Sequence, residues 1–225
     1  LAFSMDEYKR FAWFYDLVLH FAIDKVRKKI TDIIDQHEGT KIIDLCCGTG
    51  NQLSYLKKKG YTDLTGVDIS PSMLKQANKG TSRGTCKKQD ATALDFESDQ
   101  FDIGIIGYAL HGKNIEVARK ILSEAERIVK PGGLLILLDF NNHNKVPGYI
   151  KAMAHMIERL AGKDHYRNFR SYQRFGGLPK LMEGKQPKET HKYHKGITLL
   201  QVYTVKPNSG NNDPETRQSE INKIK

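Results

Sequence analysis

Short β-branched runs alternate with stretches of helical periodicity over residues 40–140, and this alternation constrains the fold more than any other feature. The expected strands lie at residues 41–45, 64–68, 85–88, 101–107 and 134–140. Helices are expected over 51–59, from the Ser70-Pro71 cap onward, and along a face of Val117, Ile121, Ala125 and Ile128 that stops at Lys130-Pro131-Gly132-Gly133. Such alternation predicts a parallel sheet covered by helices on both faces, with the ligand at the carboxyl ends of the strands.

The flanking segments complete a single expected domain over residues 1–206. Apolar residues of an N-terminal helical cap, residues 1–38, are spaced as on one helix face: Leu19, Ile23, Val26, Ile30 and Ile33. Residues 39–140 form the core, and residues 141–206 form a basic lid, helical over 147–183, with a closing antiparallel hairpin of 189–194 and 197–205. Residues 207–225 are almost free of apolar residues and are expected to be a flexible tail. The fold class is α/β, a doubly wound, mostly parallel seven-stranded sheet.

Three expected strands end in residues suited to an adenosine. The first ends in the Gly-rich turn Asp44-Leu45-Cys46-Cys47-Gly48-Thr49-Gly50, where a ligand can approach the backbone. Leu53 replaces the third glycine of the dinucleotide fingerprint, which argues against a pyrophosphate. Asp68 ends the second strand and can accept both hydroxyls of a ribose, and Gln89-Asp90-Ala91 after the third strand can accept an adenine amine. These strand ends together indicate an adenosine without phosphates.

These motifs, with Gly66-Val67-Asp68-Ile69-Ser70-Pro71, Phe101-Asp102 and Val129-Lys130-Pro131-Gly132-Gly133, resemble those of class I S-adenosylmethionine-dependent methyltransferases, which are Rossmann-like. Over about residues 13–206 the chain is most similar to the ubiquinone/menaquinone-biosynthesis methyltransferases and their small-molecule relatives. The weaker matches are Phe14-Tyr15-Asp16-Leu17, His165-Tyr166-Arg167 and Lys195-Gly196-Ile197. Where the quinone enzymes have an Arg-Asn pair after a Phe-Gly pair, this chain has Tyr108-Ala109-Leu110-His111-Gly112, which puts a quinone acceptor in doubt.

The resemblance implies S-adenosylmethionine as the cofactor and a role for each matching residue. Asp44 and the backbone at Cys46, Gly48 and Gly50 would hold its methionine part, and Asp68 would hold the ribose. Ile69 and Met73 would face the adenine, Asp90 and Ala91 its edge, and Tyr108 would lie near the sulfonium. Met73 and Asp44 have structural alternatives, as a core residue and as a brace of the turn, and Cys46 and Cys47 are interpreted as small buried residues.

His111 is the first candidate for a general base, with Tyr108 beside the reacting methyl group. An unperturbed imidazole titrates near neutrality, and His111 follows the fourth expected strand. The alternative is a polar wall residue that orients the substrate. His143 could point into the same cleft, and Tyr166, Arg170 and Tyr172 fit either a substrate lid or a solvated helix face. His191 and His194 are expected at the surface.

The charge is concentrated in the lid. Lys and Arg number 36 against 26 Asp and Glu, a net charge of +10, and residues 141–206 alone hold 13 basic and 4 acidic side chains. An anionic small molecule or a peripheral contact with an anionic membrane therefore ranks above nucleic acid as a partner. The sequence leaves a homodimer open.

The three cysteines are an odd number and form no C-x-x-C pair, so no metal site or disulfide framework is expected, which favours a reducing, cytoplasmic location. No apolar run is long enough to span a membrane, and no signal-peptide pattern opens the chain. The leading function is methyl transfer to a small-molecule acceptor, anionic or quinone-like. The alternatives are a phospholipid or RNA methyltransferase that uses residues 141–206, and a protein that binds the cofactor without turnover.

Overall fold

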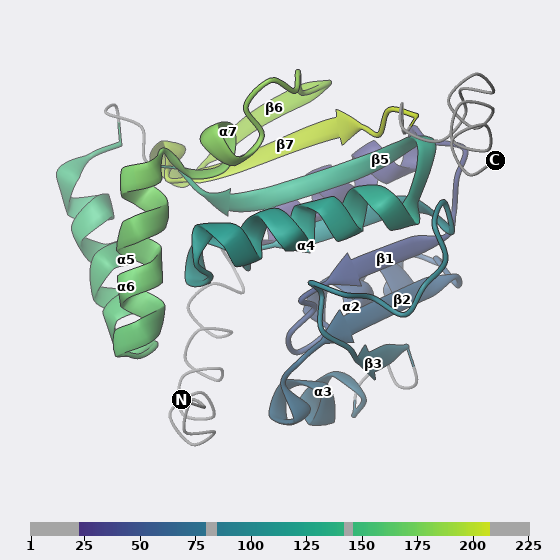
Figure 1. Cartoon of the computed structure of the whole chain (residues 1–225), viewed down its shortest axis with the longest axis horizontal. Coiled ribbons are helices and arrows are strands. Elements are labelled where there is room, and N and C mark those ends of the chain that lie inside the picture. The colour runs from purple at the N-terminus through teal and green to yellow at the C-terminus, as the bar shows by residue number, and fades with distance from the viewer. Residues whose placement is uncertain (1–22, 80–84, 142–145, 208–225) are drawn as a thin grey trace, which may run out of the picture.

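A computed structural model describes residues 23–79, 85–141 and 146–207, and within them the chain forms one seven-stranded sheet of order β3-β2-β1-β4-β5-β7-β6 (Figure 1). Strands β1 to β5 are parallel, and β7 runs antiparallel to its neighbours β5 and β6. The strands are β1 (Ile42–Leu45), β2 (Leu64–Asp68), β3 (Cys86–Lys88), β4 (Phe101–Gly107), β5 (Val129–Phe140), β6 (Glu189–Tyr193) and β7 (Thr198–Thr204). This confirms the expected fold class and the closing hairpin.

Helices form where the sequence places their caps and apolar faces. The Ser70 side chain accepts a hydrogen bond from the Met73 N–H at the start of α3, and Asn114 does the same for Val117 at the start of α4. Residues 23–35 are also helical. The remaining helical elements are α2 (Asn51–Lys58), α3 (Pro71–Ala77), α4 (Ile115–Ile128), α5 (Gly148–Leu160), α6 (Lys163–Phe175), α7 (Gly177–Leu181) and the 3-10 turns η1 (Leu110–Gly112) and η2 (His194–Gly196).

The core lies on both faces of the sheet. One apolar cluster joins the strands to α4, α6 and α7 and contains Ile121, Phe169 and Leu178. The other joins them to residues 23–35, α2 and α3 and contains Val26 and Leu53. Two helical layers therefore cover the sheet, as the alternation predicts.

The expected start of the fifth strand at Leu134 is wrong. Strand β5 begins at Val129, which pairs with Phe101, and the pairing shifts in register before Leu134. Pro131 and two glycines do not end the strand, because Gly132 adopts a positive φ of 83° and its N–H donates to the Val205 carbonyl across the sheet. The preceding helix does stop before Lys130, as expected, since α4 ends at Ile128, and residues 129–133 form an irregular first part of the strand.

Helices α5 and α6 lie beyond the carboxyl end of β5, side by side (Figure 1). Helix α6 also contacts η1, which follows β4. The structure thus brings the helical part of the lid to the edge of the sheet where a ligand is expected. Leu19 in the cap, His143 and the tail from residue 208 lie outside the described residues, and the single domain over 1–206 stays a prediction.

Candidate active site

A cavity of about 630 Å³ lies at the carboxyl ends of the strands. Its volume falls within the usual range for small-molecule sites, about 300–1,000 Å³. The turn after β1, the end of β2, residues 89–92 and the segment from Gly107 to Lys113 form most of its wall, and Glu158, Ala161 and His165 close it from the lid. The position is the one that the parallel sheet predicts.

Most of the residues predicted for cofactor and catalysis line this cavity. They are Asp44, Cys46, Gly48, Asp68, Ile69, Met73, Asp90, Ala91, Tyr108 and His111. Gly50 is not among the lining residues; it is the N-cap of α2, at φ 71°, between the lining residues Thr49 and Asn51. The structure therefore collects the predicted residues around one space, and their individual roles stay predictions.

Asp68 is held in a fixed orientation by the backbone. The N–H of Gly48 donates to Oδ2 over 2.8 Å, and the N–H of Ser70 donates to Oδ1 over 2.8 Å. Gly48 has φ 54°, a conformation that favours glycine, and this turn directs its N–H at the carboxylate. Each carboxylate oxygen has a further lone pair, so Asp68 can still accept two hydroxyls.

The other two acidic residues at the strand ends, Asp44 and Asp90, differ in the protonation state that their surroundings favour. Burial raises the pKa of Asp44 well above its usual range, and the neighbouring Cys86 and Asp68 raise it further, which favours the neutral acid. Hydrogen bonds from the N–H and hydroxyl of Thr92, both to Oδ1, lower the pKa of Asp90. Asp90 is therefore an exposed, ionised acceptor at the mouth of the cavity, whereas Asp44 can also donate.

An apolar wall lies between these acidic residues. Ile69 is 56% exposed although it is aliphatic, and it lines the cavity beside Met73, which is 9% exposed. A planar apolar ligand placed there would remove the Ile69 side chain from water.

The cysteines at the turn are not activated nucleophiles. Burial raises the pKa of the Cys46 thiol to about 12, and a hydrogen bond with Cys86 together with burial raises that of Cys47. Both thiols are therefore protonated near neutral pH, in agreement with their interpretation as small packed residues.

Tyr108 is fixed at both ends. Its N–H donates to the Leu138 carbonyl over 2.7 Å, and its hydroxyl shares a 2.9 Å hydrogen bond with Thr198 Oγ1. Burial raises the pKa of this phenol above its usual value. Tyr108 thus presents a neutral ring to the cavity. The Tyr108 backbone adopts a positive φ of 50°.

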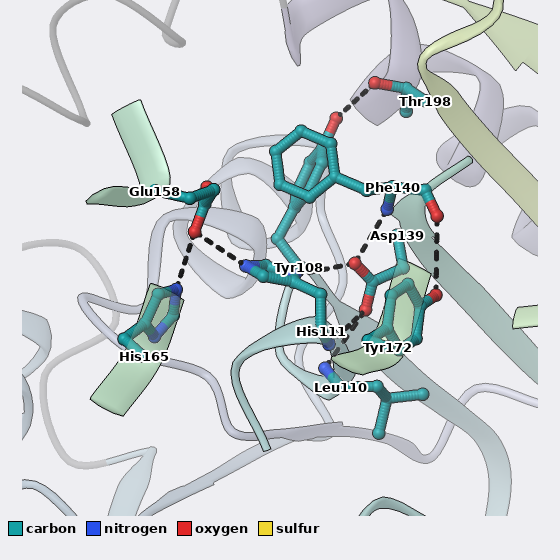
Figure 2. Close-up of polar contacts among 9 residues, drawn as sticks. All are labelled: Tyr108, Leu110, His111, Asp139, Phe140, Glu158, His165, Tyr172 and Thr198. Carbon is teal, nitrogen blue, oxygen red and sulfur yellow. Dashed lines mark hydrogen bonds and ion pairs between the residues drawn. The ribbon is translucent and has the colours of Figure 1, made fainter. Parts of the chain in front are cut away.

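His111 lies in a buried cluster with two carboxylates and a second histidine (Figure 2). Its Nδ1 contacts Asp139 Oδ1 at 2.6 Å, and its Nε2 contacts Glu158 Oε2 at 3.3 Å. The same Glu158 oxygen contacts His165 Nε2 at 2.6 Å. The cluster joins the turn after β4, the end of β5 and both lid helices.

The near-neutral titration expected of His111 is wrong. Burial alone would lower its pKa, but Asp139 and Glu158 outweigh burial and raise the pKa to about 10. Burial likewise raises the pKa of Glu158, yet His111 and His165 lower it to about 2. His111 is therefore an imidazolium near neutral pH with both nitrogens engaged, which favours the alternative of a polar wall residue that orients the substrate, and its catalytic role stays a prediction.

Asp139 and Glu158 were not predicted from the sequence. Asp139 is acidic and close to a strand end, a signal that could have found it, and Glu158 is the one acidic residue between 141 and 163. His165 entered only through the family resemblance.

The remaining lid candidates do not reach the cavity. Tyr172 is buried and its hydroxyl donates to the Phe140 carbonyl, so neither interpretation, substrate lid or solvated face, is correct for it. Tyr166 shares a hydrogen bond with His155, and the Arg170 guanidinium lies over the Tyr166 ring. His191 and His194 are partly exposed and bond to Glu189 and Thr198, as expected for surface residues.

We expect Asp139→Asn to destabilise the protein by about 3–5 kcal/mol, because it removes the nearer of the two carboxylates paired with the buried imidazolium of His111. Asp164→Asn is the matched control, since it breaks an exposed pair with Arg167 that contributes under about 1 kcal/mol. Urea unfolding measures both. Equal effects of the two substitutions would contradict the importance assigned to Asp139.

Comparison with known proteins gives matches to methyltransferases. A family model described as a methyltransferase domain matches residues 42–133. Demethylmenaquinone methyltransferases of Staphylococcus aureus, from strains JH9 and Newman, are 35% identical over 128 residues, which are 54% of this chain and 52% of the relative. The chain thus spans about half the length of the curated relatives it matches.

Solved structures share the fold. A Thermotoga maritima S-adenosylmethionine-dependent methyltransferase, described as a possible histamine N-methyltransferase, has a TM-score of 0.65 at 21% identity, covering 90% of this chain and 100% of its own. Magnesium protoporphyrin IX methyltransferase of Synechocystis PCC 6803, solved with bound S-adenosylhomocysteine, has a TM-score of 0.58 at 18% identity, covering 81% of each chain. Residues 42–133 therefore match a methyltransferase-domain model, and the chain shares its fold with solved S-adenosylmethionine-dependent methyltransferases.

Proposed function

We propose that the protein transfers the methyl group of S-adenosylmethionine to a small-molecule acceptor with an ionisable oxygen. The observation that carries this proposal is that one cavity is lined by the fixed carboxylate of Asp68, the exposed aliphatic Ile69 and the ionised Asp90. An adenosine needs a ribose acceptor, an apolar face and an amine acceptor, and these three residues supply them.

In this proposal the strand-end residues bind the cofactor piece by piece. Asp68 accepts the two ribose hydroxyls, Ile69 and Met73 cover the adenine, and Asp90 with Ala91 meets its edge. Asp44 and the backbone of Cys46, Gly48 and Gly50 hold the methionine part. Tyr108 lies beside the sulfonium, where its fixed, neutral ring limits the directions open to the acceptor.

The cofactor supplies an electrophilic methyl group, so the chain's own residues mainly need to align the acceptor and exclude water. The new bond forms between the acceptor and the methyl carbon as the carbon–sulfur bond breaks, and the acceptor's proton leaves to solvent. Covalent catalysis by the cysteines is not needed.

The guanidinium of Arg27 favours an anionic acceptor. Arg27 is 7% exposed, lines the cavity and lies close enough for its charge to act on the Tyr108 hydroxyl. The imidazolium of His111 adds no net positive charge to the cavity, because it is paired with the carboxylates of Asp139 and Glu158. A carboxylate or phenolate oxygen of the acceptor would interact favourably with the Arg27 guanidinium.

Asp68→Asn tests the proposed cofactor site. Loss of charge-assisted hydrogen bonds, each about 1.5–3 kcal/mol, should weaken S-adenosylhomocysteine binding about 10- to 100-fold in calorimetry. Asp63→Asn, at the opposite end of the same strand and exposed, is the control and should bind as the parent does. With methyl-labelled cofactor and a metabolite extract, the parent should label a small molecule and Asp68→Asn should not. Unchanged affinity in Asp68→Asn would refute the assignment.

A second candidate acceptor is a lipid-embedded molecule at an anionic membrane surface. Four large apolar side chains of α5 are about half exposed or more and repeat at helical spacing: Tyr149, Met153, Met156 and Leu160. Basic residues flank this stripe at Lys151, Arg159 and Lys163. An apolar stripe with basic flanks is typical of helices that lie on anionic membranes. No helix among residues 23–79, 85–141 and 146–207 is long and apolar enough to cross one.

Met156→Asp tests this second candidate. If α5 inserts its stripe, the substitution should lower sedimentation with anionic vesicles about tenfold, because burying a methionine side chain contributes about 1.5–3 kcal/mol. Thr62→Asp makes the same charge change at an exposed residue before β2 and should leave sedimentation unchanged. If the parent protein does not sediment with vesicles at low salt, the membrane acceptor is ruled out and the soluble acceptor remains.

A further inference from the structure

We propose that His111, Glu158 and His165 bind one divalent transition-metal ion at the lid side of the cavity. One nitrogen of each histidine and one oxygen of Glu158 all lie within 4.8 Å of one another. His111 and Glu158 are buried, and His165 is partly buried. All three residues line the cavity, so an ion held between them would face the bound ligands.

One of the ligand-atom distances already matches that of a four-coordinate site, and the others bracket it. Metal–ligand bonds of about 2.0–2.2 Å in a tetrahedron separate neighbouring ligand atoms by about 3.3–3.6 Å. His111 Nε2 and Glu158 Oε2 are already 3.3 Å apart. His165 Nε2 and Glu158 Oε2 are 2.6 Å apart, so binding of the ion requires these two atoms to separate by about 0.7–1 Å. The ion would take the place of the protons now shared among these atoms.

His111 has the second hydrogen bond that metal-binding histidines usually make. Its Nδ1 contacts Asp139 Oδ1 at 2.6 Å, which directs Nε2 toward Glu158 and His165 (Figure 2). Asp139 is itself held by the N–H groups of Leu110 and Phe140, at 3.0 and 2.7 Å. A carboxylate behind a ligating imidazole fixes the ring and makes the free nitrogen more basic.

His165 is positioned by a glycine. A Cβ on Gly112 would lie 2.5 Å from the His165 ring, so the ring packs directly against this part of the backbone. The Asn168 side-chain amide, one turn further along α6, donates to the Gly112 carbonyl over 3.0 Å and ties the helix to the same turn. Two independent contacts thus hold the second histidine in place.

The ligand set selects the class of ion. Two imidazoles and one carboxylate suit Zn²⁺, Co²⁺ or Fe²⁺ rather than Mg²⁺ or Ca²⁺, which prefer all-oxygen sites. Three protein ligands leave a coordination position open, as in catalytic rather than structural zinc sites. The role of this open coordination position rests on the proposed function. The position would bind the oxygen of the methyl acceptor and favour the ionised form of that oxygen, with the proton leaving to solvent.

Metal analysis after equilibrium dialysis tests the site. Chelator-treated protein is dialysed against Zn²⁺, or against Co²⁺ for its visible absorption, and the bound ion is measured without any activity assay. The parent should hold about one ion per chain, and Glu158→Gln and His165→Ala should each hold less than about a tenth of that. His191→Ala removes a surface histidine that also pairs with a glutamate, Glu189, and should hold as much as the parent.

Gly112→Ala keeps all three ligands but displaces the His165 ring, and it should weaken binding at least about tenfold. This variant, together with a thermal melt of each protein, separates loss of the site from loss of the fold. No retained ion in the parent would overturn the proposal, as would equal retention in His165→Ala, since the ion would then lie elsewhere, for example at the cysteines. S-adenosylhomocysteine binding measured on the same samples reports separately on the proposed function.

Discussion

The carboxylate of Asp139 is the interaction on which the lid side of the cavity depends. Asp139 is 1% exposed, and a buried carboxylate is tolerated only when donors surround it. It receives the N–H groups of Leu110, His111 and Phe140 and the ring of His111. These bonds fix the turn after β4 against the end of β5. Through His111 and Glu158 they extend to both lid helices, so one buried charge joins the sheet to the helices that cover it (Figure 2).

The cofactor side of the cavity could be predicted from the sequence because it is local. Each of its residues follows a strand of a parallel sheet, and the ends of parallel strands converge whatever the details of packing. Asp68 and Asp90 therefore line one cavity although 22 positions separate them. The start of β5 was missed because Pro131 and the following glycines suggest a break, whereas the positive φ of Gly132 lets the strand continue.

The lid side could not be predicted in the same way. His111 and Asp139 meet because β4 and β5 are adjacent, but Glu158 and His165 join them only through the packing of α5 and α6. No spacing in the sequence encodes that contact. The altered pKa of His111 has the same origin, since it follows from partners that the tertiary structure supplies. Tyr172 was wrongly assigned to a substrate lid or a solvated helix face, because helical periodicity does not indicate whether a tyrosine ring is buried.

A crystal structure of the protein with S-adenosylhomocysteine tests the central claim, that the cavity at the strand ends is the cofactor site, most directly. We expect the ribose hydroxyls against Asp68, the adenine beside Ile69 and the sulfur directed toward Tyr108 and the region of His111. S-adenosylhomocysteine bound at another place, or with its ribose away from Asp68, would show that these strand ends do not form the cofactor site.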